Sequence, residues 1–349
     1  MRKLNIAVIF GGLSPEYGIS LESAHSVISH MDAEKYAPVL IGISSKGDWF
    51  RFDGDIEKIA RDTWCNSLDC IPAALSLNRT AHTLLVFHPD RTEVISIDAA
   101  FPVLHGRNGE DGTVQGLLEL AGIPLVGCGT LSSALCMDKD RAHRLVRAAG
   151  IPVPDSFVLE KSMDAEKALA QAEGLGYPLF VKPIRAGSSF GITKVTDRRK
   201  LPDAIKLAFS YDDQAVIEKN ITGFEVGCAI MGNDDLTVGE VDEIELSSGF
   251  FDFAEKYTLK TSAIHLPARI SKEKAEEIKK TARIIYRVLG CRGFARVDMF
   301  LDAYGAIVFN EVNTIPGFTS HSRFPNMMKA IGISFEQIIS YVIELAVRA

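Results

Sequence analysis

Side chains that could bind a metal ion and stabilise an anion occur together near the end of the chain: Arg296, Asp298, Glu311 and Asn313. They belong to two strand-like runs, residues 294–301 and 306–313, which flank a short turn ending in Gly305. This pattern is typical of a β-hairpin. Because side chains alternate between the two faces of a strand, the four polar groups are expected on one face of the hairpin.

The turn also predicts how the two strands pair. With a four-residue connection, Arg296 is expected to face Glu311, and Asp298 to face Phe309. Carboxylates are costly to bury unless a ligand binds them, and an all-oxygen set suits Mg²⁺ or Mn²⁺ bridged by phosphates. An adjacent arginine suits an anion that develops in a transition state. The alternative is a structural Arg296–Glu311 ion pair, with Asp298 as solvated surface.

A second segment carries groups that could bind phosphates. Lys182 ends a strand-like run and is followed by Gly187, Ser188 and Ser189. A lysine beside a Gly/Ser loop offers charge and backbone N–H donors to phosphates, although a surface hairpin with an exposed lysine explains the pattern as well. Glu225 follows another strand-like run, and it could bind ribose hydroxyls or be a solvated carboxylate.

Composition limits the class of protein. The chain has 349 residues, 47% of them hydrophobic, so two or three soluble domains are expected. A net charge of -7 argues against nucleic acid or an anionic membrane as the main partner. The first apolar run, residues 6–10, is too short for a signal peptide, and no apolar stretch approaches the length of a membrane span. The six cysteines lack metal-like spacing. We therefore expect a cytoplasmic protein with reduced thiols.

Hydrophobic patterning divides the chain into three parts. Residues 1–135 alternate apolar strands and helices, which indicates an α/β domain with a parallel sheet covered on both faces. Residues 136–225 read as a compact α+β unit. Residues 226–349 are expected to form a mixed sheet with two later helices, and the polar, aromatic segment 247–269 has no clear period, which is typical of a functional loop.

The individual elements follow from apolar period and from helix stop signals. Strands are predicted at residues 6–10, 39–43, 99–104, 156–159, 179–182 and 216–219. Helices are predicted at residues 19–31, 113–121, 140–149, 164–173, 201–210, 272–289 and 335–347. Gly122 is expected to end the second of these helices. Residues 46–95 hold turns and hairpins that the pattern does not place.

These motifs, taken in order, resemble the D-alanine:D-alanine ligases of the ATP-grasp superfamily over essentially the whole chain. The matching segments are Gly11 to Glu16, His105 to Gly112, Met137 to Lys139, Val181 to Pro183, Gly187 to Ser189, Glu255 to Tyr257, Arg296 to Asp298, Asn310 to Thr314 and Pro316-Gly317. The resemblance implies an ATP-grasp fold with an N-terminal parallel-sheet domain. It also implies ATP and two Mg²⁺ ions, with Mn²⁺ as a substitute, and a homodimer.

The resemblance assigns the nucleotide and metal residues. It implies that Lys139 and Lys182 contact ATP phosphates, with Ser188 and Ser189 in the loop that covers them. The remaining roles are Glu218 and Lys219 at the adenine, Glu225 at the ribose, Lys256 near the γ-phosphate, and Asp298, Glu311 and Asn313 at the metal ions. Residues 247–269 would form a lid that excludes water from an acyl-phosphate.

The resemblance also assigns the amino-acid substrates. Arg296 would steady the tetrahedral oxyanion. Glu16 would hold the ammonium of the first substrate, D-alanine, and His105 would lie near its carboxylate. Ser320 and Ser322 fall in the segment that would hold the carboxylate of the second. A hydrogen-bonded triad of Glu16, Ser188 and Tyr257 would link the three parts.

The sequence departs from the family pattern at two positions, and the second of them bears on the acceptor. Position 17 is Tyr, where these ligases often carry His. Arg323 stands where D-alanine-specific ligases usually have an apolar residue, and it resembles the D-alanine:D-serine ligases of vancomycin resistance, such as the VanG type. Residues 250–253, rich in phenylalanine, support that likeness. Tyr257 separates the chain from D-alanine:D-lactate ligases, which carry His in the lid. The alternative for Arg323 is a side chain that turns outward or pairs with a carboxylate.

Other functions stay open at this stage. Within the family, the alternative is a housekeeping D-alanine:D-alanine ligase. A dinucleotide-dependent oxidoreductase would need a glycine fingerprint, which Gly127-Cys128-Gly129 lacks, and the P-loop motif is absent too. A regulatory nucleotide-binding module would not need the complete set of metal, arginine and lysine residues.

Overall fold

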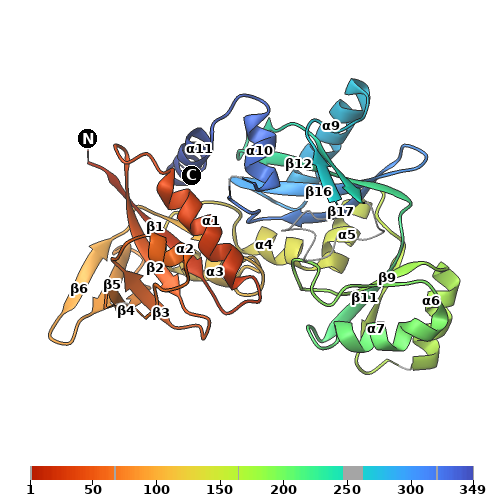
Figure 1. Cartoon of the computed structure of the whole chain (residues 1–349), viewed down its shortest axis with the longest axis horizontal. Coiled ribbons are helices and arrows are strands. Elements are labelled where there is room, and N and C mark those ends of the chain that lie inside the picture. Colours follow the sequence, from red (N-terminus) through yellow and green to blue (C-terminus); the bar gives the residue numbers. More distant parts are fainter. Residues whose placement is uncertain (1, 67, 164, 247–261, 320, 349) are drawn as a thin grey trace.

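The computed structural model describes the whole chain except residues 1, 67, 164, 247–261, 320 and 349. Figure 1 shows a first body at one end and two further bodies stacked at the other end. Each body is built on one of three sheets. The domain boundaries at residues 135/136 and 225/226 stay predictions.

The first sheet has a parallel centre. Strand β1 (Leu4–Gly11) lies between β2 (Tyr36–Ile43) and β7 (Ala99–Val103) and runs parallel to both. Alternate residues of β1 enter two different apolar clusters, one with helix α1 (Tyr17–Ser29) and one with helix α3 (Thr113–Ala121). The sheet is therefore covered on both faces, as a parallel sheet requires.

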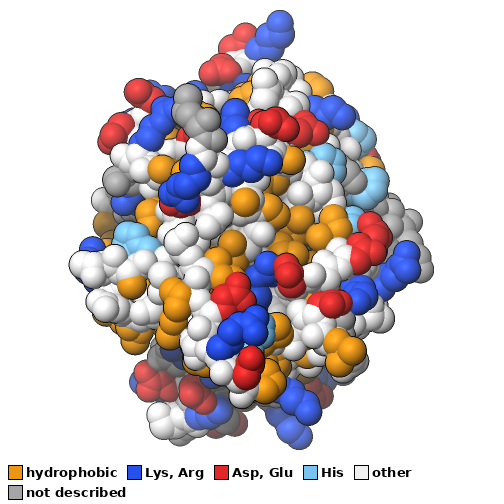
Figure 2. Space-filling model, turned by 90° about the vertical axis from the view of Figure 1, so that its left-hand side faces the viewer, with side chains coloured by type: hydrophobic (Ala, Val, Ile, Leu, Met, Phe, Trp, Pro, Cys, Tyr) orange, Lys and Arg blue, Asp and Glu red, His pale blue; other side chains and the backbone are white. Residues whose placement is uncertain are grey.

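Antiparallel strands extend this sheet to one side. They are β3 (Trp49–Phe52), β4 (Cys70–Leu75), β5 (Thr83–Phe87) and β6 (Thr92–Ser96), with the short helix α2 (Glu57–Ala60) before β4. They occupy the region that the sequence pattern did not place. Figure 2 views this end of the molecule, where apolar side chains gather between charged ones.

The second sheet is small and antiparallel. Its order is β10-β9-β11-β8, formed by Thr193–Val195, Leu179–Pro183, Gln214–Lys219 and Ser156–Glu160. Helices α6 (Ala165–Leu175) and α7 (Leu201–Ala208) pack on it, and a single 3₁₀ turn, Arg198–Lys200, precedes α7. The three predicted strands and two predicted helices are confirmed, whereas β10 was not predicted.

The third sheet carries the acidic hairpin. Its strands are β12 (Gly223–Met231), β13 (Thr237–Val238), β14 (Asp242–Leu246), β15 (Ser262–His265), β16 (Phe294–Asp302) and β17 (Ile307–Asn313). Every pairing among these described strands is antiparallel, so the expected mixed sheet is wrong. Helix α9 (Lys272–Val288) lies between β15 and β16 in the chain, and helices α10 (Arg323–Lys329) and α11 (Phe335–Val347) follow β17. Helix α10 was not predicted.

A β-bulge corrects the predicted register of the hairpin. Arg296 pairs with Asn313 and Asp298 with Glu311, and the register then shifts so that Met299 pairs with Phe309. The bulge adds one residue to β17, which turn length and alternation could not reveal. The four polar side chains still share one face, because the paired positions are two residues apart on each strand.

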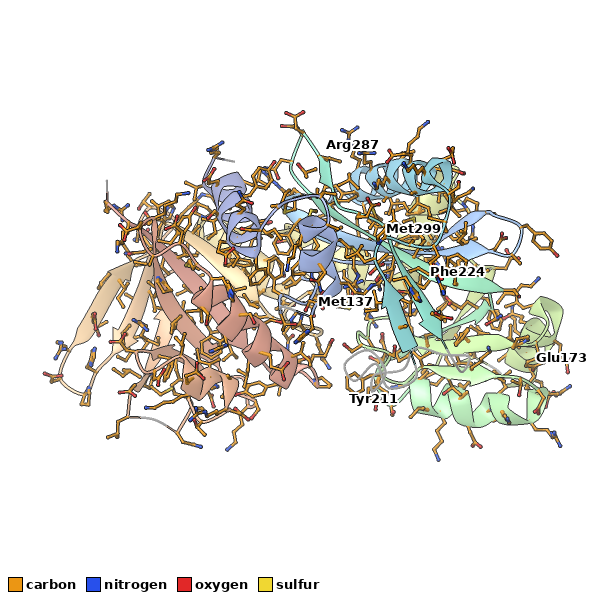
Figure 3. The ribbon with its side chains drawn as sticks, turned by 45° about the horizontal axis from the view of Figure 1, so that its top comes forward. Met137, Glu173, Tyr211, Phe224, Arg287 and Met299 are labelled. Carbon is orange, nitrogen blue, oxygen red and sulfur yellow. The ribbon has the colours of Figure 1, made fainter. Side chains whose placement is uncertain are left out.

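Two helices join the bodies: α4 (Thr130–Met137) and α5 (Lys139–Ala148). Figure 3 places Met137, at the end of α4, between the first body and the strand that carries Met299. Buried aromatic rings complete the junction, with Phe101 of β7 at 6.0 Å from Phe294 and 5.8 Å from Phe318. Among the described helices, none combines the length and apolarity needed to cross a membrane.

Candidate functional site

Predicted site residues from all three parts line one cavity of about 320 Å³ where the bodies meet. They are Glu16, His105, Ser188, Arg296, Asn313, Ser322 and Arg323. Glu16 begins helix α1, His105 follows β7, Ser188 follows β9, and the others belong to the third sheet and the loop after it. Residues more than 300 positions apart in sequence therefore face a common space.

Asp298 is the centre of the acidic face. Its side chain is 1% exposed and accepts hydrogen bonds from Arg296 Nε (2.8 Å) and Nη2 (2.7 Å) and from Asn313 Nδ2 (2.9 Å). Glu311 lies opposite it in the register. The alternative of a solvated Asp298 is therefore wrong, and Arg296 pairs with Asp298.

The donor set on this face suits a hard divalent cation. Asp298, Glu311 and Asn313 offer carboxylate and amide oxygens from adjacent strands. Only two of the three are acidic, and no cluster of three or more His, Cys, Asp or Glu side chains placed for a metal ion occurs among the described residues. Mg²⁺ and Mn²⁺ prefer such oxygen ligands. The residues present thus fit the metal that the sequence predicts.

Two lysines approach the space between the second and third sheets. Lys182 of β9 forms an ion pair with Glu218 of β11, and both side chains are buried. Lys139 donates from Nζ to the carbonyl oxygen of Ala186 at 2.7 Å. The side chain of Lys219, next in β11, is exposed.

The Glu16–Ser188 contact links the first and second bodies. The Ser188 hydroxyl donates to Glu16 Oε1, and the carboxylate is buried. Ser188 and Ser189 both have positive φ, 46° and 62°, an unusual conformation for residues with a side chain. A Cβ at Gly187 would lie 2.8 Å from Glu16 Oε2, so a larger residue there would displace the Glu16 carboxylate. Strain of this kind often marks a binding loop.

His105 and Glu110 hold the loop after β17 against the first body. His105 Nδ1 donates to the carbonyl of Ile315 at 3.0 Å, and the N–H of Ile315 donates to Glu110 Oε1 at 3.2 Å. Burial lowers the pKa of His105 to about 4, so its ring is neutral near pH 7. Burial and then the charge of Glu16 raise the pKa of Glu110 well above its ordinary range.

Arg323 begins helix α10 and is almost fully buried. It donates from Nε and Nη2 to the two oxygens of Asp242, each at 2.7 Å, and from Nη1 to Glu225 Oε1 at 2.8 Å. Asp298 Oδ1 lies 3.4 Å from Nη1. The expected alternative, in which Arg323 pairs with a carboxylate, is therefore the arrangement found. Arg323 itself still lines the cavity.

Ser322, the other described acceptor residue, occupies the N-cap position of helix α10, without a capping hydrogen bond from its side chain. Its hydroxyl oxygen accepts from the Thr319 N–H at 2.9 Å and lies 2.8 Å from Thr319 Oγ1. The remaining predictions, Ser320, Lys256, Tyr257 and most of the lid, lie outside the described residues. Of the predicted lid, residues 262–265 form the edge strand β15, and Arg269 N donates to Glu243.

Comparison with known proteins decides the family. A model described as "D-ala D-ala ligase N-terminus" matches residues 5–128, and one described as "D-ala D-ala ligase C-terminus" matches residues 145–344. The chain belongs to the D-alanine–D-alanine ligase family. It is therefore a ligase of the ATP-grasp type, from a family that forms a peptide bond using ATP and a divalent metal ion.

Relatives within the family differ in name. The crystal structure of VanG D-Ala:D-Ser ligase from Enterococcus faecalis is 55% identical, with a TM-score of 0.91, and the match covers 99% of this chain and 100% of that one. Vancomycin B-type resistance protein VanB from Enterococcus faecalis is 47% identical over 99% of both chains. The D-alanine–D-alanine ligase of Caldicellulosiruptor bescii is 46% identical over 99% of this chain and 96% of its own.

The sequence analysis missed residues whose role is to hold other side chains or loops of the site in place. Asp242 is one acidic residue in an ordinary strand, and its pairing with Arg323 across 81 positions leaves no local signal. Glu110 lay within a matched motif but received no role. His143, on α5, could have been noticed because it stands four positions after Lys139 and so shares its helical face.

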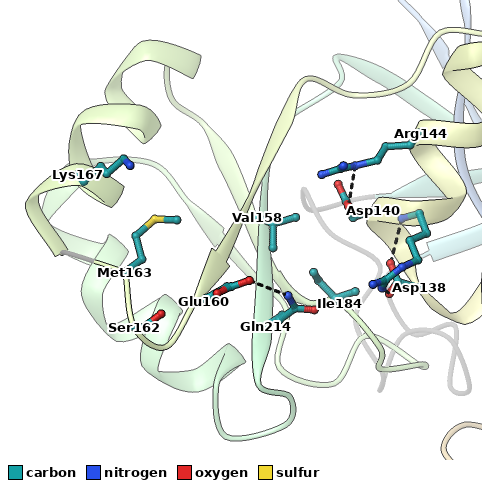
Figure 4. A pocket seen from close by; sticks show the side chains of 11 residues that line it. Asp138, Asp140, Arg144, Val158, Glu160, Ser162, Met163, Lys167, Ile184 and Gln214 are labelled. Carbon is teal, nitrogen blue, oxygen red and sulfur yellow. Dashed lines mark hydrogen bonds and ion pairs between the residues drawn. The ribbon is translucent and has the colours of Figure 1, made fainter.

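A larger cavity, of about 620 Å³, is lined by residues of α5 and of the second sheet. Figure 4 shows Asp140 and Arg144 of α5 on one side of it and Met163 and Lys167 on the other. Two of its arginines are paired with acidic residues of the lining, Arg144 Nε with Asp140 Oδ2 at 2.8 Å and Arg141 with Asp138. It is lined by none of the predicted site residues, whereas seven of them line the smaller cavity between the bodies.

Proposed function

We propose that this ligase joins D-alanine to D-serine through a D-alanyl phosphate, with ATP as the phosphoryl donor. The observation that carries the proposal is Arg323, which lines the cavity shared by Glu16, His105, Arg296 and Ser322 and is held by the buried carboxylate of Asp242. A charged pair offers both donors and acceptors to the acceptor's side chain. D-Alanine has only a methyl group to place there, whereas D-serine has a hydroxyl.

Activation by ATP explains the phosphate and oxyanion residues. A carboxylate is a poor electrophile, so an oxygen of D-alanine takes the γ-phosphoryl group and ADP leaves. The amine of the acceptor then attacks the carbonyl carbon, a C–N bond forms, the amine loses a proton and phosphate departs. Lys139 and Lys182 would hold phosphates, and Arg296 would stabilise the oxygen that becomes negative in the tetrahedral state.

The acidic face would hold two Mg²⁺ ions, for which Mn²⁺ could substitute. Asp298, Glu311 and Asn313 supply the oxygen ligands, and the metal would neutralise charge on the transferring phosphoryl group. Asp298 also contacts Arg296 at 2.7 Å, so the oxyanion donor and the metal ligand are fixed relative to each other. Glu225 would bind the ribose. One of its carboxylate oxygens already accepts a hydrogen bond from Arg323, which also donates to Asp242.

The substrate-holding residues surround the same cavity. Glu16 would bind the ammonium group of D-alanine, with His105 near its carboxylate. Ser320 and Ser322 would bind the acceptor's carboxylate, while Lys256 and Tyr257 would close the site. Ser188 and Ser189 would cover the phosphates. Glu218 and Lys219 would contact the adenine.

Acceptor choice rests on the guanidinium of Arg323. Its bonds to both oxygens of Asp242 fix the plane of the group, and Nη2 keeps a second hydrogen beyond the one it gives to Asp242. A polar site built for a hydroxyl discriminates strongly against a ligand that lacks one, because its own polar groups are then left unpaired. The name of the VanG relative agrees with this direction. A dipeptide ending in D-serine would enter peptidoglycan precursors and confer vancomycin resistance. The enzyme would act as a homodimer in the cytoplasm.

The test is kcat/KM for D-serine and D-alanine as acceptors, with D-alanine as first substrate. The wild type should prefer D-serine, and Arg323→Leu should lower that preference by roughly 1–3 kcal/mol, or about 5- to 150-fold. Because Arg323→Leu strands a buried carboxylate, the double variant Asp242→Asn/Arg323→Leu should be measured beside it. The exposed Arg348, which pairs with Glu344, gives the control Arg348→Leu.

Two results would replace this proposal with the housekeeping function. The first is a wild type that makes D-alanyl-D-alanine at least as well as D-alanyl-D-serine. The second is an unchanged acceptor ratio in a folded Arg323 variant.

A further inference from the structure

His143 is a buried histidine that the ligase chemistry above does not use. It lies on α5 and is 3% exposed. Its Nε2 is 2.8 Å from the carbonyl oxygen of Asn310, the residue that the bulge inserts into β17. Its ring also packs edge-on against Phe309, with ring centres 5.5 Å apart. The orientation of the ring is therefore fixed from both sides.

This contact decides which ring nitrogen carries the proton. A carbonyl oxygen can only accept, so Nε2 of His143 is the donor. Burial lowers the pKa of His143 while the charge of Glu218 raises it, and the net direction is downward, toward a neutral ring. Nδ1 then presents a lone pair, and it has no hydrogen-bond partner among the described residues.

Glu218 carries another buried acceptor atom that, like His143 Nδ1, has no hydrogen-bond partner among the described residues. One of its carboxylate oxygens, Oε1, takes the ion pair with Lys182, whereas Oε2 is buried and finds no partner among the described residues. Glu218, Lys182 and Lys139 all act electrostatically on the His143 ring, so these groups share one neighbourhood. Two buried acceptors without a donor are costly, and such groups call for a ligand that supplies hydrogens.

The family's nucleotide limits which donor this is. Phosphate oxygens of ATP mainly accept, and each ribose hydroxyl donates one hydrogen. The exocyclic amine of adenine carries two N–H groups on one nitrogen, which matches two acceptors. We propose that His143 Nδ1 and Glu218 Oε2 together bind this amine, and that His143 is a specificity residue for 6-aminopurine over 6-oxopurine nucleotides. The inference rests on the nucleotide site proposed above, but not on the choice of acceptor.

Equilibrium binding tests the contact without turnover. ADP, purine riboside 5′-diphosphate, which has hydrogen at C6, and IDP, which has oxygen there, should be titrated calorimetrically with Mg²⁺. The wild type should bind ADP most tightly. In His143→Leu, ADP should weaken roughly 5- to 10-fold, the effect of one hydrogen bond, while purine riboside diphosphate should change less than about twofold. His143→Gln, whose amide oxygen can accept, should recover part of the ADP affinity.

Arg144→Leu is the matched control, since it alters the next residue of the same helix on the face that lines the other cavity. It should leave all three affinities unchanged. Equal weakening of ADP and purine riboside diphosphate in His143→Leu would mean that the residue acts through packing on Phe309, and would overturn the inference. A wild-type enzyme that binds ADP and purine riboside diphosphate with equal affinity would overturn the inference too. Either result leaves the D-serine proposal intact, because that proposal is tested by acceptor kinetics.

Discussion

Arg323 and Asp242 form a two-point contact, with Nε and Nη2 of the guanidinium each 2.7 Å from a different carboxylate oxygen. Both side chains are nearly buried, at 9% and 1% exposed. Such a fork fixes the plane of the guanidinium as well as its position. It also means that a change at one residue alters the state of the other.

The first prediction concerns the stability of this pair. Arg323→Leu should cost about 3–5 kcal/mol, because Asp242 is left as a buried charge without its main partner. Adding Asp242→Asn removes that charge, so the double variant should be more stable than Arg323→Leu alone. Urea unfolding of the two variants measures this. A double variant less stable than the single one would show that Asp242 keeps another strong partner.

The second prediction concerns the metal face. Glu311→Gln should keep the fold but lower turnover about 10²-fold or more, because the metal loses a carboxylate ligand that neutralises phosphoryl charge. Steady-state ADP release at saturating substrates measures this. Glu344→Gln, on the surface at the end of α11, is the control and should be fully active. Near-normal activity in Glu311→Gln would remove this residue from the metal site.

Local signals predicted the elements with clear ends. Helix α11 begins at Phe335 and ends at Val347 as expected, because Ser334 and Gln337 form a capping box that defines its first turn. Helix α3 ends before Gly122, whose φ of 72° stops the helix. The start of α11 and the end of α3 each depend on a few adjacent residues, so the sequence alone could predict them.

The sequence predicted which residues form the site but not which of them contact one another. Alternation put Asp298 and Glu311 on one face, yet the bulge at Asn310 changed which residues pair. Period-2 patterning contains no information about a single inserted residue. The partners of Arg323 were also invisible, because Asp242 lies in a different strand whose position depends on the whole third sheet. Motif resemblance therefore predicted residues, whereas their contacts required the fold.

The third prediction concerns pH. The pKa of His105 is lowered to about 4 in the folded protein, from 6.5, chiefly by burial. Between these values the unfolded chain binds a proton that the folded protein does not, so folding stability falls as pH drops through this window. The loss from this residue should reach roughly 3 kcal/mol near pH 4.

His105→Gln isolates this contribution, since glutamine can still donate to the Ile315 carbonyl but does not titrate. Unfolding free energies of both proteins should be measured by urea at pH 7 and at pH 4.5. The wild type should lose roughly 2–3 kcal/mol more than the variant over this range. If both proteins lose the same unfolding free energy, the His105 ring is protonated in the folded state at pH 4.5. That result would contradict a neutral ring hydrogen-bonded to Ser23 and Ile315.

The last prediction uses Gly227, which packs against the Arg323–Asp242 pair from β12. A Cβ at this position would lie 2.3 Å from Arg323 Nη2 and 2.7 Å from Asp242 Oδ1. Gly227→Ala must therefore displace the pair, at a cost of about 1–3 kcal/mol in stability for the overpacking. If the pair contacts the acceptor, the kcat/KM ratio of D-serine to D-alanine should fall roughly tenfold, the effect of one misplaced hydrogen bond. Gly174→Ala is the matched control, because a Cβ at Gly174 meets nothing within 4 Å and should leave the ratio unchanged. A folded Gly227→Ala enzyme with the wild-type ratio would mean that Arg323 and Asp242 brace the sheet without touching the acceptor's side chain, and the basis of D-serine selection would have to lie elsewhere in the cavity.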